Sequence, residues 1–254
     1  MNQIDTEPTP PLALLCAVAQ EAAMLRDTLQ NAAEVEIGRK KAWRGALDGV
    51  PVILFPVGMG KTNAAHGATA LLETHAVRGV VGFGIAGAYP GAGLEVGAVA
   101  LASEVVYADE GVRAPGGWMS TEGIGIPLVE RGGVRRFNDF PLDPRRVENA
   151  RAALEAAGVQ VRVGPALTVS TCSGTTARGE ELAARHGALT EGMEGAAIAH
   201  VCALYDVPFL EVRGISNAVE DRDLSRWRIR EGVEAAQRAV RIVARAWTDR
   251  TQSL

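Results

Sequence analysis

Short apolar runs alternate along the chain with segments whose apolar residues recur at helical spacing. The runs predict buried strands at 12–18, 51–57, 79–84, 96–106 and 207–215, with two more near 160–171. Helical spacing predicts helices at 20–30, 62–74, 144–157, 178–186 and 231–247, and segment 194–205 is apolar all round, as a buried helix would be. Together these elements predict an α/β fold. It should be a three-layer sandwich with a central mixed, largely parallel twisted sheet flanked by helices.

The sheet is expected to be mixed because the strands within 41–57 and 160–171 follow one another with no helix between them. Residues 1–11 combine acids with prolines and predict a flexible tail, not a signal peptide, so residues 12–254 should form a single domain. Segment 107–142 is rich in Gly and Pro and lacks periodicity, which is typical of a lid or binding loop.

Composition narrows the range of functions. The 254 residues include 26 Lys and Arg against 30 Asp and Glu, a net charge of −4 that argues against a nucleic-acid or membrane-surface partner. No run of 18 apolar residues is present to predict a spanning helix. The three cysteines, Cys16, Cys172 and Cys202, are far apart in the sequence and form no CxxC pair. We therefore expect reduced thiols that act as small hydrophobes in a cytoplasmic protein. Neither the cysteines nor the four histidines show metal-ligand spacing, and no metal is expected.

Two glycine-rich stretches look like cofactor motifs but lack a required part. The sequence GFGIAG at 82–87 fits a dinucleotide fingerprint, but Pro90, Gly91 and Gly93 follow where a helix would have to begin. The sequence GMGKT at 58–62 ends like a phosphate-binding loop, but Phe55 replaces its first glycine. We therefore expect no cofactor. Both stretches still follow strands, which is where open α/β sheets bind small ligands.

Four polar residues stand at predicted strand or helix ends, namely Glu21, Glu194, Arg213 and Asn217. Taken singly, each has an ordinary structural explanation, such as a helix-start acid, an ion pair or a turn. Taken together, they offer two carboxylates, one guanidinium and one amide to a single ligand.

The stretches that carry these residues are also familiar. GMEGAAIAHVCALYDVPFLEVRGISN at 192–217, VGMGKTNAAHGATALLE at 57–73 and the glycine-rich stretch at 82–111 resemble the nucleoside phosphorylase and nucleosidase superfamily. The resemblance extends over 12–247. The glycine-rich segment, RGISN and the arginine-rich segment 222–229 are most similar to the futalosine hydrolase branch. That branch hydrolyses the N-glycosidic bond of futalosine to hypoxanthine and dehypoxanthine futalosine in an alternative menaquinone pathway.

The resemblance implies a role for each matching position. Glu21 falls where related nucleosidases hold the carboxylate that orients the attacking water, and Arg213 falls near that water. Met193 should line the sugar face, Glu194 should accept hydrogen bonds from the sugar hydroxyls and Asn217 should contact the purine N7. The superfamily also implies a purine nucleoside as the small-molecule partner and a homodimer or larger homo-oligomer.

Other positions are implied less directly. The turn expected at Ile85, Ala86 and Gly87 should approach the sugar and water, and Cys172 lies in segment 170–174, where adenosine-type relatives place an aromatic residue on the base. Within 107–142, Tyr107, Arg113, Trp118 and Met119 are candidates to meet an acidic aromatic end of the substrate.

This chain also departs from the adenosine-type pattern. It has Ile85 instead of a serine, Asn217 instead of an aspartate and no aromatic residue at 170–174, which argues against methylthioadenosine. The arginine and serine cluster with which phosphorylases bind phosphate cannot be assembled, so hydrolysis is favoured. The alternatives are another purine nucleosidase, a phosphorylase of the inosine or methylthioadenosine type, and a nucleoside-binding protein without turnover.

Overall fold

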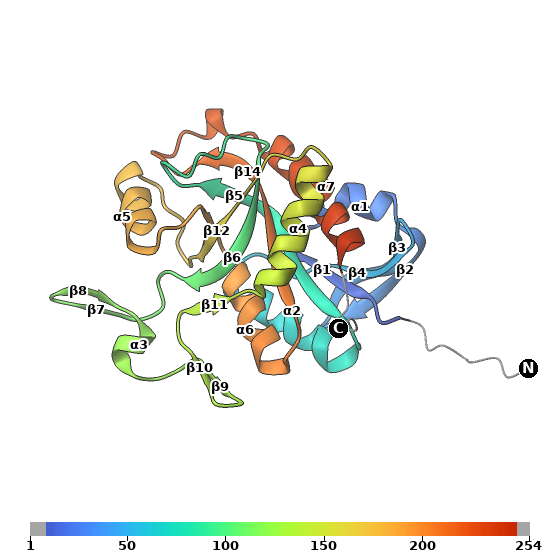
Figure 1. Cartoon of the computed structure of the whole chain (residues 1–254), viewed down its shortest axis with the longest axis horizontal. Helices are drawn as coiled ribbons and strands as arrows, with labels where there is room; N and C mark the ends of the chain where they lie inside the picture. The colour runs from blue at the N-terminus through green and yellow to red at the C-terminus, as the bar shows by residue number, and fades with distance from the viewer. Residues whose placement is uncertain (1–8, 248–254) are drawn as a thin grey trace, which may run out of the picture.

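The computed structural model describes residues 9–247, and most of its strands belong to one large sheet (Figure 1). The strands of that sheet are β1 (Leu12–Cys16), β2 (Gln30–Ile37), β3 (Lys40–Leu47), β4 (Val50–Pro56), β5 (Gly79–Ala88), β6 (Val99–Tyr107), β11 (Asp139–Pro141), β12 (Val161–Thr168), β13 (Thr190–Gly192) and β14 (Phe209–Ala218). The helical segments are η1 (Ala19–Ala22), α1 (Ala23–Asp27), α2 (Lys61–Thr74), α3 (Thr121–Ile124), α4 (Pro144–Ala156), α5 (Thr176–His186), α6 (Gly195–Tyr205), η2 (Leu224–Arg226) and α7 (Ile229–Ala246).

The sheet is parallel at its centre and antiparallel toward its edges. Strands β4, β1, β5 and β14 run parallel in that order, while β2, β3 and β4 form an antiparallel meander. On the other side, β14 pairs antiparallel with β6, and β6 pairs parallel with β12. Strand β12 in turn pairs parallel with β13, and β13 pairs antiparallel with β5. These five strands therefore close into a ring, and the carboxyl end of β5 lies between β14 and β13.

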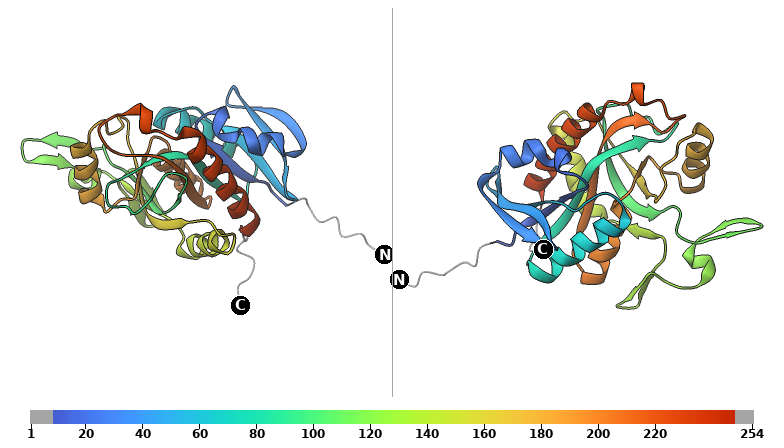
Figure 2. Two further views of the ribbon diagram at one scale, coloured as in Figure 1. Left: turned by 90° about the horizontal axis from the view of Figure 1, so that it is seen from above. Right: turned by 180° about the vertical axis from the view of Figure 1, so that it is seen from behind.

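Helices cover both faces of β14 (Figure 2). Gly214 abuts the backbone of α7, and a side chain at that position would meet the carbonyl oxygen of Gly232. Glu211 instead points toward Gly195, the first residue of α6. Because alternate residues of a strand face opposite sides, Arg213 shares the α6 face with Glu211. Helices α2 and α6 pack together on this side of the sheet, and α1 and α4 pack with α7 on the other.

The expected α/β class, with helices around a mixed sheet, is confirmed, and most predicted elements are present. The predicted helix 20–30 is wrong in its last part, because helical structure ends at Asp27 and β2 begins at Gln30. Most of β2 is exposed, so it carried no apolar run that could have revealed it. The two strands expected near 160–171 are one strand, β12, with an irregularity in its pairing between Gly164 and Ala166.

Two expected loops also have regular structure. Residues 85–87 form no turn, because β5 continues to Ala88 through pairing with β14 and β13. Segment 107–142 contains two small hairpins and α3, which project from the sheet in Figure 1. The hairpin strands are β7 (Val112–Ala114) with β8 (Gly117–Met119), and β9 (Val129–Arg131) with β10 (Val134–Arg136).

The predicted tail 1–11 falls mostly outside the described residues, which begin at Thr9. Of its last residues, Pro11 is buried and its carbonyl oxygen accepts a hydrogen bond from the Arg78 N–H. At the other end of the chain, residues 248–254 also lie outside the described part. Across residues 9–247, no helix combines the length and the apolar character needed to cross a membrane.

Candidate active site

Glu21 is buried where the chain leaves β1. Strand β1 ends at Cys16, and η1 turns the chain so that the Glu21 carboxylate faces back toward the strand ends. Its Oε2 accepts hydrogen bonds from the Ala17 and Val18 N–H groups, at 2.9 and 3.2 Å, and its Oε1 accepts one from the Ile85 N–H at 2.9 Å. Burial raises the pKa of Glu21, while the Ile85 N–H and the positive charge of Arg213 act in the opposite direction. A carboxylate held in this way can act as a base near neutral pH.

Gly84 lets three elements meet at one point. Its φ is +152°, and a Cβ there would lie 2.4 Å from Glu21 Oε1 and 3.1 Å from Arg213 Nη1. Only glycine permits this approach without displacing one of the two charged groups. Glu21 and Arg213 therefore flank the same short stretch of β5.

Glu194 occupies the N-cap position of α6, and it is buried. Its Oε1 accepts a hydrogen bond of 2.9 Å from the N–H of Gly60, the residue just before α2. Its Oε2 lies 3.3 Å from the Met193 N–H and 3.7 Å from Arg213 Nη1. The amino ends of α2 and α6 both lie at this carboxylate, so the Gly60 N–H and the two helix dipoles stabilise its negative charge.

Arg213 connects the acids. Its Nε donates to Glu211 Oε1 at 3.0 Å, and its Nη1 lies 3.5 Å from the Ile85 carbonyl oxygen. Burial alone would lower the pKa of Arg213, but the carboxylates of Glu211 and Glu194 raise it above its ordinary value. Fully ionised, three buried carboxylates around one guanidinium leave a negative site, which favours a ligand that becomes positively charged.

Asn217 lies near the carboxyl end of β14, directly after Ser216, and it pairs with Gly87 of β5. The Ser216 hydroxyl lies 2.8 Å from its Oδ1, and its Nδ2 donates to the Ala218 carbonyl oxygen at 2.8 Å. With the oxygen facing Ser216, the second hydrogen of Nδ2 remains for another acceptor. A Cβ on Gly87 would lie 3.2 Å from Nδ2, so this amide faces the glycine.

Segment 170–174 is held by a buried acid, Glu191. Its Oε1 accepts from the Ser173 N–H at 2.7 Å, and its Oε2 accepts from the hydroxyls of Ser173 and Tyr89 at 2.6 and 2.9 Å. Cys172 is exposed, so the expectation that the cysteines act as small hydrophobes is wrong at this position. Burial of part of the thiol, followed by the charges of Glu191 and Glu194, raises the pKa of Cys172.

The structure thus brings Glu21, Glu194, Arg213 and Ile85 to one place, with Ile85 in contact with Glu21 and Arg213, and Arg213 next to Glu194. Met193 contributes a backbone N–H to Glu194, while Gly87 faces Asn217. The carbonyl oxygen of Ala86 accepts a hydrogen bond from the Ser216 hydroxyl, so its backbone is engaged within the sheet.

Three residues at the site were not expected from the sequence: Gly60, Glu191 and Glu211. The strand period could have revealed Glu211, because it stands two residues before Arg213 and so shares its face. No local signal marks Glu191 or the contact between Gly60 and Glu194, since these pairs form only when the sheet assembles.

Tyr107 and Trp118, which the sequence placed in a possible binding loop, lie in different surroundings. Lys61 directly follows Gly60 in the chain, and its ammonium group lies 5.1 Å from the centre of the Tyr107 ring. Trp118 instead packs on α5, with its ring 5.9 Å from that of His186 and under the Arg185 guanidinium. Of these two aromatic residues, Tyr107 is therefore the one beside Lys61, the residue that follows Gly60.

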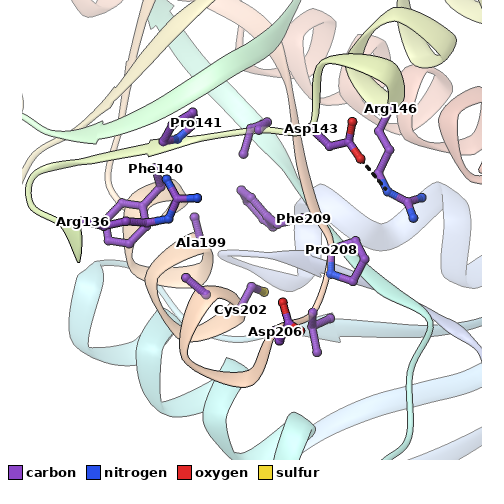
Figure 3. A pocket seen from close by; sticks show the side chains of 13 residues that line it. Arg136, Phe140, Pro141, Asp143, Arg146, Ala199, Cys202, Asp206, Pro208 and Phe209 are labelled. Atoms are coloured by element: carbon purple, nitrogen blue, oxygen red, sulfur yellow. Dashed lines mark ion pairs between the residues drawn. The ribbon is translucent and has the colours of Figure 1, made fainter. Parts of the chain in front are cut away.

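A cavity of about 190 Å³ lies elsewhere, at the carboxyl-terminal half of α6 (Figure 3). It is lined by Phe140, Cys202 and Phe209, among others, with Asp143 and Arg146 at one side. None of the predicted site residues lines it. Among residues 9–247, no group of three or more His, Cys, Asp and Glu side chains could hold a metal ion.

Known proteins are similar to this chain in sequence and in fold. Residues 11–247 match the Phosphorylase superfamily. Futalosine hydrolase from Thermus thermophilus is 39% identical over 203 residues, which cover 79% of this chain and 84% of the relative. A 5'-methylthioadenosine/S-adenosylhomocysteine nucleosidase from Anoxybacillus flavithermus is 31% identical over 208 residues, covering 81% of this chain and 84% of the relative. The crystal structure of the corresponding nucleosidase from Neisseria meningitidis superposes with a TM-score of 0.81 at 23% identity, over 94% of this chain and all of that one.

The chain therefore belongs to the phosphorylase superfamily. Within the superfamily it is a nucleosidase, an enzyme that cleaves an N-glycosidic bond.

Proposed function

We propose that this enzyme hydrolyses the N-glycosidic bond of futalosine and releases hypoxanthine. The observation that supports this most directly is the cluster of Glu21, Glu194 and Arg213, with Asn217 further along the strand that carries Arg213. The cluster provides the groups for hydrolysis of a nucleoside, and Asn217 favours a 6-oxopurine base. The 39% identity to the futalosine hydrolase of Thermus thermophilus points in the same direction.

The sugar is the centre of the chemistry. As the bond from C1' to the base breaks, positive charge develops on the ribose ring. Glu194 would accept hydrogen bonds from the sugar hydroxyls, and its negative charge would stabilise that cation, with Met193 lining the sugar. Preorganised charge of this kind contributes the largest catalytic effect in many enzymes.

The attacking water would be held by Glu21. Its carboxylate accepts the proton that the water loses when its oxygen bonds to C1', and a proton reaches the departing base through solvent. The raised pKa of Glu21 suits it to accept a proton near neutral pH. Arg213, beside both acids, would help to hold the water, and the backbone of Ile85 and Ala86 would lie against it.

The base would be recognised through Asn217. An amide donates a hydrogen bond to N7 of the leaving purine and so stabilises the negative charge that develops on it. It cannot transfer a proton as an aspartic acid can. The one Nδ2 hydrogen not bound to Ala218 could instead be donated to the oxygen of a 6-oxopurine such as hypoxanthine, whereas a 6-aminopurine presents a donor there. Gly87 leaves space beside the amide, and Cys172 would lie at the edge of the base site.

A second candidate is the hydrolysis of methylthioadenosine or S-adenosylhomocysteine. The 31% identity to the nucleosidase of Anoxybacillus flavithermus favours it. The amide at Asn217 and the absence of an aromatic side chain within 170–174 argue against it. A homo-oligomer and the absence of nucleic-acid partners remain predictions from the sequence.

One assay decides among these. Purified protein is incubated with futalosine, inosine or methylthioadenosine, each with and without phosphate, and the free base is measured. We expect hypoxanthine from futalosine at the same rate with and without phosphate. Adenine from methylthioadenosine as the main product supports the second candidate. A rate that depends on phosphate identifies a phosphorylase. If no free base is released from any of the three nucleosides, the result favours a binding protein.

A further inference from the structure

Glu211 is a buried carboxylate that the mechanism above does not use. Both it and Arg213 have side chains only 4% exposed. Its Oε1 accepts the Arg213 Nε–H at 3.0 Å, but its Oε2 is buried and has no hydrogen-bond partner among the described residues. A buried carboxylate with an unused oxygen is costly, so its presence requires an explanation.

The surrounding chain makes room for this group. A Cβ on Gly195, the residue after Glu194, would lie 1.8 Å from Glu211 Oε2. Any side chain at position 195 would therefore displace Glu211. The backbone at the start of α6 thus accommodates the carboxylate at the point where the helix presents Glu194.

The contacts of Arg213 are divided between two sides. Glu211 binds the guanidinium only through Nε, although arginine–carboxylate pairs frequently form two parallel hydrogen bonds. The Nη1 group is left for the site, where it lies near the Ile85 carbonyl oxygen and 3.7 Å from Glu194 Oε2. The shorter contact is thus to Glu211, and the contact to Glu194 is long for an ion pair.

We propose that Glu211 is a positioning residue that holds Arg213 back from Glu194, so that the Glu194 carboxylate keeps its charge for the sugar cation. This inference rests on the proposed hydrolysis of a nucleoside. Without Glu211, the guanidinium would move onto Glu194 and form a close pair. Glu194 would then be neutralised when positive charge develops on the ribose.

The test is a double-mutant cycle with Glu211→Gln, Arg213→Gln and the double variant, assayed on the nucleoside that the wild type hydrolyses fastest. We expect Glu211→Gln to lower kcat by about 10- to 100-fold, because displacing a group in the site by about 1 Å can cost about 100-fold, with KM within threefold. Because Glu211 acts through Arg213, the double variant should be no slower than Arg213→Gln alone. Removing both charges together also avoids leaving one of them unpaired, which favours folding of the double variant.

The control is Asp48→Asn, which breaks an ion pair with Arg241 on α7, where Arg241 Nε lies 2.7 Å from Asp48 Oδ2. It should leave kcat unchanged. A Glu211→Gln enzyme with kcat within threefold of the wild type overturns the proposal. So does a double variant in which the two losses multiply, because that indicates a structural role independent of Arg213. A wild type that hydrolyses no nucleoside refutes the proposed function instead, which separates the two failures.

Discussion

Replacing Glu194 by glutamine tests the electrostatic basis of the mechanism most directly. The side chain keeps its size, and its oxygen can still accept the Gly60 N–H, but the negative charge is lost. A unit charge about 4 Å from a developing cation contributes about 4 kcal/mol at an effective dielectric constant of about 20. At 1.36 kcal/mol for each tenfold change in rate, turnover should fall by about 10³-fold.

The fold should survive this change, because Arg213 keeps its hydrogen bond to Glu211. The melting temperature should stay within about 4 °C of the wild type, which corresponds to about 1 kcal/mol for a chain of this length. Turnover is measured by release of the free base under saturating substrate, and stability by thermal unfolding.

The matched control is Glu181→Gln on α5, where Glu181 pairs with Arg178 at the surface, with an N–O distance of 2.6 Å. The same chemical change at that position should leave turnover unaltered. A Glu194→Gln enzyme that retains more than a tenth of wild-type turnover would refute the argument, since the charge would then not act on the transition state.

Three further predictions follow from the same geometry. Gly195→Ala places a Cβ 1.8 Å from Glu211 Oε2 and should destabilise the fold by about 1–3 kcal/mol in denaturant unfolding. The control Gly116→Ala adds a Cβ with nothing within 4 Å and should change the free energy of unfolding by less than about 0.5 kcal/mol. Equal losses of stability in the two variants would contradict the close contact between Gly195 and Glu211. Asn217→Asp should raise the kcat/KM ratio of methylthioadenosine to futalosine at least about tenfold, since a protonated acid donates to N7 and its other oxygen accepts from a 6-amino group; an unchanged ratio removes residue 217 from base selection. Burial raises the pKa of Glu21, and only its ionised form can act as the base. As the pH is lowered, kcat/KM should therefore begin to fall at a pH above about 4.3, the usual pKa of glutamate. A decline in kcat/KM that begins only at or below that pH rules out Glu21 as this base.

Much of the fold could be predicted because buried strands and helices leave patterns within their own residues. The run of apolar residues in β1 and the all-apolar α6 are readable without their neighbours. Strand β2 is different, because seven of its eight residues are not buried and its place depends on pairing with β3. The continuation of β5 through 85–87 likewise depends on β13 and β14, so the glycines there looked like a turn.

The candidate site divides in a similar way. Glu21, Glu194, Arg213 and Asn217 stand at element ends within motifs that resemble a known superfamily, so they could be identified one by one. The roles of Gly60 and Glu191 could not, because each acts through a residue distant along the chain, such as Tyr89 at Glu191 Oε2.

The sequence by itself determined the class of fold, the acidic and amide groups available for chemistry, and the family to which the chain belongs, because all three depend on residue types at short and regular spacing. Only the tertiary structure decided how those groups share charge. The distances from Arg213 to Glu211 and to Glu194, 3.0 and 3.7 Å, arise where β14 meets the start of α6. Electrostatic energy depends on such distances and on burial, and neither is encoded in any local segment.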